Sequence, residues 1–186
     1  MDIFDFACFG TSLTSADARE WQRDVAKALC VGASVPCAQY DCGKSGETSV
    51  WALANTQSVI NLRPKAVLIE FAANDCATVH DISTTEFRTN MEGVVAALKA
   101  GLPDAALFLM TMNPIIAPAL TDRPNVEDYH DVLRSMVDDD LTLIDNYPLW
   151  TSPSLTQIPD GLHPTLDADR AVMVPNIIEA LRPLVP

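Results

Sequence analysis

The chain has 186 residues, 48% of them hydrophobic and 20% charged, a balance that excludes a disordered chain and predicts one globular domain over residues 1–186. Its 25 acidic and 12 basic residues give a net charge of −13, which argues against binding to nucleic acid or to anionic membranes. The longest apolar run, Ala66 to Ala73, contains Glu70 and is far too short to cross a bilayer.

The N-terminal segment and the cysteines indicate the compartment. MDIFDFACFG has no basic segment before its apolar residues and no cleavage site, so it is typical of a first strand and not of a signal peptide. We therefore expect a cytoplasmic protein, although a chain already trimmed of a leader has the same pattern. The cysteines lack a C-x-x-C pair and predict buried free thiols rather than a disulfide framework or a zinc site. They are Cys8, Cys30, Cys37, Cys42 and Cys76.

Short apolar runs rich in Val, Ile, Leu and Phe recur along the whole chain. Such nearly continuous hydrophobicity is typical of strands in a parallel sheet that is covered on both faces. The expected strands are Ile3–Phe9, Ser34–Tyr40, Ala66–Phe71, Ala106–Thr111 and Leu141–Asp145.

The segments between these runs have the longer period of amphipathic helices. The expected helices are one that buries Trp21, Val25 and Leu29, one over Glu47–Asn61, one that begins after the capping box Ser83 to Glu86, one over Val126–Asp139, and one from after Thr165 to about Leu181. Five β–α units in a row predict an α/β protein, a three-layer α/β/α sandwich with a five-stranded parallel sheet. In such a sheet, functional residues gather beyond the C-terminal ends of the strands.

Ser12 directly follows the first expected strand, in the segment FGTSLT. Gly10 lets the chain turn sharply, so that Ser12 emerges between a strand end and a helix start, where the helix dipole and free N–H groups favour negative charge. A serine hydroxyl needs this help, because it is a weak nucleophile until a base takes its proton and donors stabilise the oxyanion. Taken alone, a Gly-Thr-Ser turn is more often an ordinary helix N-cap.

A second polar segment, DGLHPT, precedes the last expected helix. Asp160, three residues before His163, can hydrogen-bond the imidazole and fix its tautomer, which leaves the other ring nitrogen free to act as a base. The ordinary alternative is a turn that these two side chains cap. His80 and His130 have no such partner in the sequence, and we expect both at the surface.

Two further segments follow other expected strands. CGKSGET can present the backbone N–H of Gly46 at a helix start, and AAND can place the side-chain amide of Asn74 beside the serine. Alone, the first is an ordinary flexible loop and the second is an asparagine that bonds its own backbone. Because the four segments arrive in order at successive strand ends, they together indicate one site.

These segments resemble the motif blocks of the SGNH hydrolases, the GDSL-like lipases and esterases, named after the Ser, Gly, Asn and His of four blocks. The resemblance spans residues 9 to 165 and implies the flavodoxin-like SGNH hydrolase fold. It implies Ser12 as the nucleophile, His163 as the base and Asp160 as its orienter. It also implies an oxyanion hole made by the N–H groups of Ser12 and Gly46 and the Asn74 amide. The implied activity is that of a serine ester hydrolase without a metal or a cofactor.

The chain departs from the family pattern at three positions. Thr11 occupies the place of the usual Asp before the serine, which changes how the serine loop is positioned. Ala72 replaces a Gly two residues before Asn74, which narrows the approach to the oxyanion hole. Asp41 replaces a common Asn in the second block, which alters the hydrogen bonding of that loop.

Three other classes of function fit the sequence less well than a serine hydrolase. A non-catalytic binding domain would keep the fold, but it would not need a nucleophile, a base, an orienter and two oxyanion donors together. A cysteine mechanism through Cys42 or Cys76 would need its own histidine. A metal mechanism would need an H-E-x-x-H motif or clustered ligands, and the sequence has neither.

The substrate is less closely defined than the reaction. The family acts on lipid esters, thioesters, aryl esters and O-acetylated sugars. We favour small esters with acetyl to butyryl groups, and O-acetyl carbohydrates or transfer to an acceptor other than water are the alternatives. The connectors 112–125 and 146–165 leave no room for a helical lid, and their apolar residues either line a shallow acyl slot or pack the loops onto the body. These residues are Ile115, Ile116, Leu149, Trp150, Leu155 and Ile158.

Overall fold

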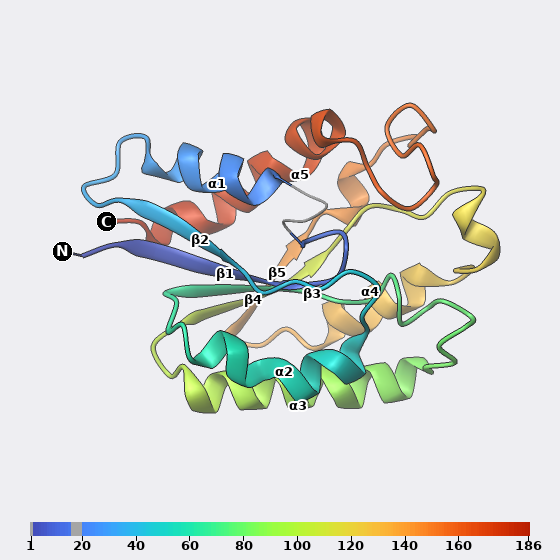
Figure 1. The fold of residues 1–186 in the computed structure, drawn as a ribbon, viewed down its shortest axis with the longest axis horizontal. Helices are drawn as coiled ribbons and strands as arrows, with labels where there is room; N and C mark the ends of the chain where they lie inside the picture. The colour runs from blue at the N-terminus through green and yellow to red at the C-terminus, as the bar shows by residue number, and fades with distance from the viewer. Residues whose placement is uncertain (1, 16–19) are drawn as a thin grey trace.

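The computed structural model describes residues 2–15 and 20–186. Its centre is a five-stranded parallel sheet in the order β2-β1-β3-β4-β5 (Figure 1). The strands are β1 (Phe4–Gly10), β2 (Cys37–Asp41), β3 (Ala66–Glu70), β4 (Ala106–Thr111) and β5 (Leu141–Asp145). The chain starts inside the sheet and winds outward in both directions, so the order reverses between β1 and β3, the place where ligands bind in sheets of this topology.

Helices cover both faces of the sheet, which confirms the predicted three-layer α/β fold (Figure 1). On one face α1 (Trp21–Cys30) packs against α5 (Leu166–Leu181), and on the other lie α2 (Ser49–Ile60), α3 (Thr84–Gly101) and α4 (Val126–Ser135). Short 3-10 helices are η1 (Ala119–Thr121), η2 (Tyr147–Leu149) and η3 (Arg182–Leu184). None of the helices in residues 2–15 and 20–186 is long and apolar enough to cross a bilayer.

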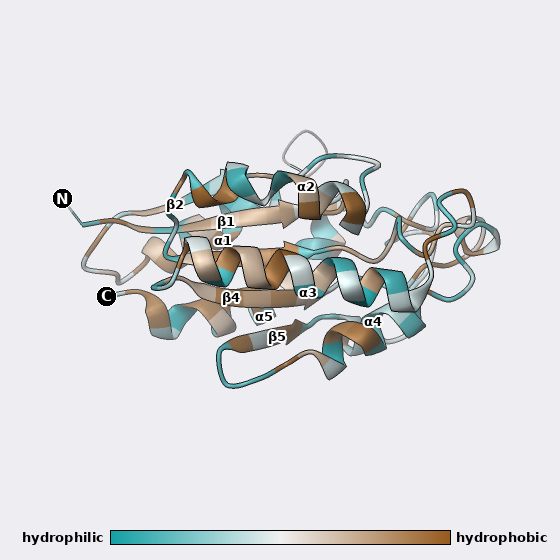
Figure 2. Ribbon diagram, turned by 90° about the horizontal axis from the view of Figure 1, so that it is seen from below, coloured by the Kyte–Doolittle hydropathy of each residue, from teal (hydrophilic) through white to brown (hydrophobic). Residues whose placement is uncertain are grey.

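The central strands supply the core because nearly every residue in them is apolar. All seven residues of β1 and all five of β3 are buried, and Figure 2 shows β4 as hydrophobic along its length. The Phe9 ring lies 5.3 Å from that of Phe71 and 5.6 Å from that of Trp51, which ties the sheet to α2. Each fully buried side chain of this kind contributes about 1.5–3 kcal/mol. This packing fixes the strand ends from which the polar segments start.

Two elements differ from their expected bounds for local reasons. β2 begins at Cys37 rather than at Ser34, because the Ser34 N–H donates to the carbonyl oxygen of Pro186 at 2.8 Å instead of joining the ladder. α4 ends four residues earlier than expected, because the chain turns there into a bridge between Asp138 and Leu141 that leads into β5. The other strands and the second helix lie within two residues of their expected bounds.

The expectation that His130 lies at the surface is wrong. Its side chain is 2% exposed, and its ring meets the Tyr147 ring edge to face at 4.9 Å between centroids. α4 buries Val126, His130 and Leu133, positions that helical spacing places on one face, so the histidine points toward the body of the protein. His80 is exposed, as expected.

We expect the buried His130 to make the fold less stable in acid. Burial, helped by the charge of Arg134, lowers the pKa of His130 from its ordinary 6.5 to about 4. Above pH 6.5 the ring is neutral in both states and has no effect; as the pH falls toward 4 the unfolded chain binds the proton first, which destabilises the fold. In the wild type, this effect should lower the unfolding free energy by about 3 kcal/mol between pH 7 and pH 4. In His130→Gln that part of the drop should be absent, and urea titrations of both proteins at the two pH values measure it. An unchanged difference would contradict this assignment.

The five cysteines are free thiols, as predicted, but they are not all buried. Cys8 and Cys76 are buried, Cys37 and Cys42 are half-buried, and Cys30 at the end of α1 is exposed. Burial raises the pKa of Cys42 to about 11 and that of Cys76 to about 12. Both groups therefore stay protonated at neutral pH, and a protonated thiol is a poor nucleophile.

Candidate active site

A tight turn presents Ser12 at the C-terminal edge of the sheet. β1 ends at Gly10, and the N–H groups of Thr14 and Ser15 both donate to the carbonyl oxygen of Thr11, at 3.0 and 2.8 Å. Ser12 therefore lies within this turn, and not at the helix start that the sequence suggested, because α1 begins at Trp21. The Ser12 side chain is half-buried in this position.

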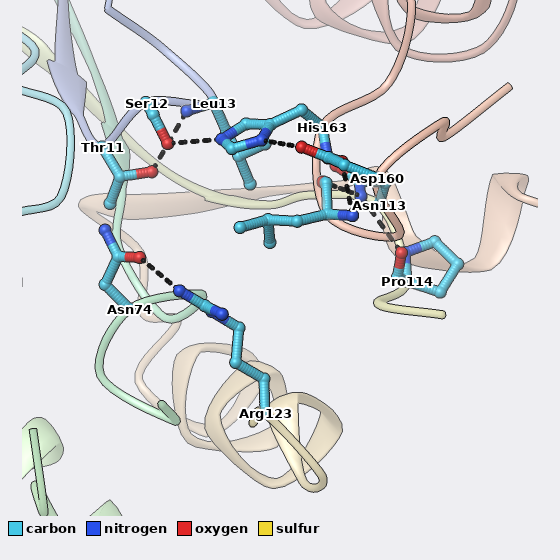
Figure 3. Close-up of polar contacts among 10 residues, drawn as sticks. Thr11, Ser12, Leu13, Asn74, Asn113, Pro114, Arg123, Asp160 and His163 are labelled. Carbon is cyan, nitrogen blue, oxygen red and sulfur yellow. Dashed lines mark hydrogen bonds and ion pairs between the residues drawn. The ribbon is translucent and has the colours of Figure 1, made fainter. Parts of the chain in front are cut away.

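Ser12, His163 and Asp160 form one line of hydrogen bonds, although 151 residues separate the serine from the histidine (Figure 3). Ser12 Oγ lies 2.8 Å from His163 Nε2, and His163 Nδ1 lies 2.6 Å from Asp160 Oδ2. The imidazole thus contacts the hydroxyl with one nitrogen and the carboxylate with the other. This arrangement lets the imidazole take the hydroxyl proton while the carboxylate fixes the tautomer.

The Asp160 carboxylate is held in its ionised form. Its burial alone would raise the pKa, but hydrogen bonds from the backbone N–H and the ring of His163, and from the N–H of Leu162, lower the pKa of Asp160 to about 2. The backbone bonds to Asp160 Oδ1 measure 2.6 Å from His163 and 2.9 Å from Leu162. An ionised carboxylate accepts the Nδ1–H of the ring and stabilises the imidazolium that forms when the base takes a proton.

Asn113 and Gly161 place the loop that carries His163. Asn113 Nδ2 donates to the carbonyl oxygen of Leu162 at 2.9 Å, and the Ile116 N–H donates to that of Gly161 at 2.9 Å. Gly161 has a φ of +81°, and a Cβ there would lie 2.3 Å from the Ile116 carbonyl oxygen, so only glycine fits. Asn113 lies two residues past the end of β4, the same kind of position that singled out the other polar segments.

Asn74 lies below the serine turn, with its amide nitrogen toward that turn (Figure 3). The side chain is 4% exposed, and its Nδ2 donates one hydrogen to the Glu47 carbonyl oxygen at 2.9 Å. An amide nitrogen has two hydrogens, so Asn74 keeps a second one for a ligand. Arg123 bonds the Asn74 carbonyl oxygen at 3.5 Å and thereby fixes which end of the amide faces the serine. Ala72, a departure from the family pattern, is buried, and its carbonyl oxygen accepts the Cys76 N–H at 2.9 Å.

The loop that carries Gly46 is tied to the end of β1. The Lys44 N–H donates to the Gly10 carbonyl oxygen at 2.9 Å, and the Gly43 N–H donates to Asp41 Oδ1 at 3.0 Å. Asp41, another departure from the family pattern, thus closes a turn of its own. Gly46 is exposed and has a φ of +80°, a conformation that side-chain-bearing residues rarely adopt.

Glu70 is a buried carboxylate beneath the serine turn whose role the sequence did not reveal. It is 1% exposed and accepts hydrogen bonds from the backbone N–H and hydroxyl of Thr11 and from the hydroxyl of Thr14. Burial raises the pKa of Glu70 to about 7; the hydrogen bonds from the two threonines act against the rise, and the neighbouring Asp75 adds to it. The only signal in the sequence is a single acidic residue inside an apolar run. Thr11, where the family usually has Asp, supports the turn through this carboxylate.

The residues predicted to line an acyl slot fall into two groups. Three belong to the buried core and pack the two connectors onto the body: Ile115, Trp150 and Ile158. The others are half-buried or exposed: Ile116, Leu149 and Leu155.

The strand order and the linked Ser12, His163 and Asp160 at one sheet edge define a class, the α/β proteins with the SGNH hydrolase fold. Comparison with known proteins then identifies the family. Residues 8–171 match the GDSL-like Lipase/Acylhydrolase family, and the chain belongs to it, as the motifs predicted. The protein is therefore an ester hydrolase of the GDSL type. No curated protein matches the chain.

Solved structures share the fold over almost the whole chain. A lipase/acylhydrolase from Enterococcus faecalis is 20% identical with a TM-score of 0.80, and the match covers 98% of this chain and 97% of that one. A carbohydrate esterase family 3 protein from Talaromyces cellulolyticus is 15% identical, with a TM-score of 0.76 and 97% of each chain covered. A mutant acetyl esterase with an acetate ion is 15% identical, with a TM-score of 0.75 and 97% and 99% covered. At these identities the likeness shows the fold alone.

Proposed function

We propose that the protein is a serine esterase that hydrolyses short-chain acyl esters through an acyl-enzyme on Ser12. The observation that carries the proposal is the continuous line from Ser12 Oγ through the His163 ring to Asp160, with contacts of 2.8 and 2.6 Å. Both distances lie within the range that proton transfer and base orientation need.

The reaction has two halves. His163 Nε2 takes the hydroxyl proton while Ser12 Oγ attacks the ester carbonyl carbon, and the electron pair moves onto the carbonyl oxygen. The oxyanion accepts hydrogen bonds from the N–H groups of Ser12 and Gly46 and from the second Asn74 amide hydrogen. Collapse expels the alcohol, which takes the proton from His163. Water then repeats the sequence on the acyl-enzyme, which releases the acid and restores the serine.

If the Asn74 amide meets the developing charge, Asn74→Ala should lower kcat by about 10²–10³ with a smaller change in KM. The loss is in kcat because the oxyanion exists only in the transition state. Steady-state kinetics on a p-nitrophenyl ester measures both constants, and thermal unfolding of the variant checks that it is folded. Asn125→Ala, at an exposed asparagine that starts α4, is the matched control. Wild-type kcat in folded Asn74→Ala would remove this residue from the mechanism.

We infer the substrate preference from the apolar side chains on two connectors. The connectors 112–125 and 146–165 hold only three-residue helices, η1 and η2, and three of their large apolar side chains are committed to the core. The exposed apolar side chains that remain on these connectors are Leu120, Leu149 and Leu155. Each CH₂ of an acyl chain adds about 0.8 kcal/mol of binding free energy, but only where it is buried against apolar side chains of the protein. Few apolar side chains thus remain on these connectors to contact a long acyl chain.

We therefore expect kcat/KM to be highest for acetyl to butyryl esters and to fall for longer chains, without activation at a lipid interface. The measurement is a series of p-nitrophenyl esters from acetate to palmitate. An optimum at octanoate or longer would show a deep acyl channel and contradict the proposal. The same assay with an O-acetylated sugar distinguishes a simple esterase from a carbohydrate esterase, the activity that the name of the Talaromyces cellulolyticus protein gives.

A further inference from the structure

We propose that Glu70 is a positioning residue for ester hydrolysis, because its buried carboxylate holds the turn that orients the Ser12 hydroxyl and N–H. The proposal rests on the proposed role of Ser12. Glu70 is the last residue of β3, directly opposite Gly10 in the register of β1 and β3. It therefore lies immediately beneath the point where the chain leaves β1 and turns toward Ser12.

Three donor groups of this turn bond the Glu70 carboxylate, and one of them, the Thr11 hydroxyl, also reaches Glu70 Oε1 at 3.2 Å. Glu70 Oε2 accepts the Thr11 N–H, the Thr11 hydroxyl and the Thr14 hydroxyl, each at 2.9 Å. All the groups involved are buried, so water does not compete for them. A carboxylate is the one side chain of this length that accepts from three donors without presenting a donor of its own. These hydrogen bonds favour the ionised form and act against the burial that raises the pKa of Glu70 to about 7.

The Thr11 hydroxyl connects Glu70 to both sides of Ser12. It donates to Glu70, and the same oxygen accepts the N–H of Leu13 at 3.2 Å. The residue before Ser12 and the residue after it are therefore fixed through one oxygen atom. Their peptide planes set the direction of the Ser12 N–H and of its Cα–Cβ bond. Those two directions decide whether the nucleophile and an oxyanion donor meet the same ester.

Gly10, at the end of β1, leaves the space that this carboxylate occupies. A Cβ on Gly10 would lie 2.6 Å from Glu70 Oε2 and 2.8 Å from Thr14 Oγ1, so glycine lets the carboxylate come this close. Thr11 completes the match, because the family's usual Asp at its place would set a second carboxylate against Glu70. Thr11 and Glu70 thus form a complementary pair in this chain.

Two isosteric variants separate positioning from general support. Thr11→Val and Thr14→Val each remove a 2.9 Å hydroxyl bond to Glu70 Oε2. Thr11→Val also removes the 3.2 Å bond from this hydroxyl to Glu70 Oε1 and the 3.2 Å bond that it accepts from the Leu13 N–H. If Glu70 acts through Thr11 on Ser12, Thr11→Val should lower kcat by about 10- to 100-fold with KM nearly unchanged. Thr14→Val should lower kcat less than threefold. Equal losses of kcat in the two variants would mean that the network only supports the fold, and would overturn the proposal.

A charge exchange supplies the second test. Thr11→Asp and Glu70→Gln should each lower kcat, the first by setting two carboxylates together and the second by turning an amide donor toward the Thr11 N–H and hydroxyl. In the double variant, the amide introduced in place of Glu70 can donate to the new carboxylate, so kcat should recover at least tenfold over the worse single variant. If the fold loss of kcat in the double variant equals the product of the fold losses in the two single variants, the pairing is contradicted. Wild-type kcat in Glu70→Gln would contradict it as well. If the wild-type protein neither turns over esters nor reacts at Ser12, the proposed function fails instead.

Discussion

Ser12→Ala should lower kcat on the order of 10⁶-fold, the largest effect expected from any single substitution in this chain. The substitution removes the oxygen that attacks the ester, and leaves His163 without the hydroxyl that it contacts at 2.8 Å. The remaining catalysis, about 10³-fold over water, would come from the oxyanion donors and from substrate binding. A stopped assay on a p-nitrophenyl ester measures this residual rate, and labelling by a fluorophosphonate probe should disappear in parallel.

The control for this loss is Ser58→Ala, at an exposed serine of α2 that lies outside the site. Its kcat and its labelling should equal those of the wild type. Labelling that persists in Ser12→Ala would mean that another residue is the nucleophile. Absence of labelling in the wild type would favour the non-catalytic binding domain that shares this fold.

Substitution of the base and of its orienter should have the next largest effects. His163→Ala should approach the loss seen without the serine, whereas Asp160→Asn should cost about 10⁴-fold in kcat, because an amide stabilises the wrong tautomer of the ring. The pKa of Asp160 is lowered to about 2, so its carboxylate is ionised throughout the working range and does not titrate there. The wild-type profile of kcat/KM against pH should therefore show no inflection from Asp160 in that range.

His80→Ala, at the exposed histidine, is the matched control for this pair. It should keep the wild-type pH–rate profile. The assignment fails if Asp160→Asn keeps full activity in a folded protein, or if the wild-type activity is lost on chelation and restored by zinc.

The sequence was most informative where function coincides with strand ends. Parallel strands bring their C-terminal ends to one edge, so the segments around Ser12, Asn74 and His163 could be expected to converge despite their separation in the chain. β4 and β5 have the predicted bounds because their apolar runs end at clear polar boundaries. The start of β2 could not be predicted, since it depends on a contact with the last residue of the chain.

Residues that support the site from the interior or from an irregular loop have no distinctive sequence pattern. Glu70 sits in an apolar run whose pattern only predicts a buried strand, and its partners become visible once β1 and β3 lie side by side. Arg123 and Asn113 lie in a connector without periodicity, so their bonds to the site depend on how that loop folds back. His130 has the helical spacing of a core position, but a polar side chain there is more typical of the surface. The spacing of residues shows which face of a helix they share. Only the packed structure shows which polar side chains on that face are buried.

A covalent acyl group on Ser12 is the central intermediate of the proposed mechanism. Brief mixing of the protein with p-nitrophenyl acetate or butyrate, followed by an acid quench, digestion and mass spectrometry, identifies the site of acylation. We expect the added acyl mass on the peptide that contains Ser12, its decay with time in water, and its accumulation in Asp160→Asn, where deacylation lacks an oriented base. An acyl group on any other residue, or turnover with no acylated peptide at any time in either protein, would contradict the account.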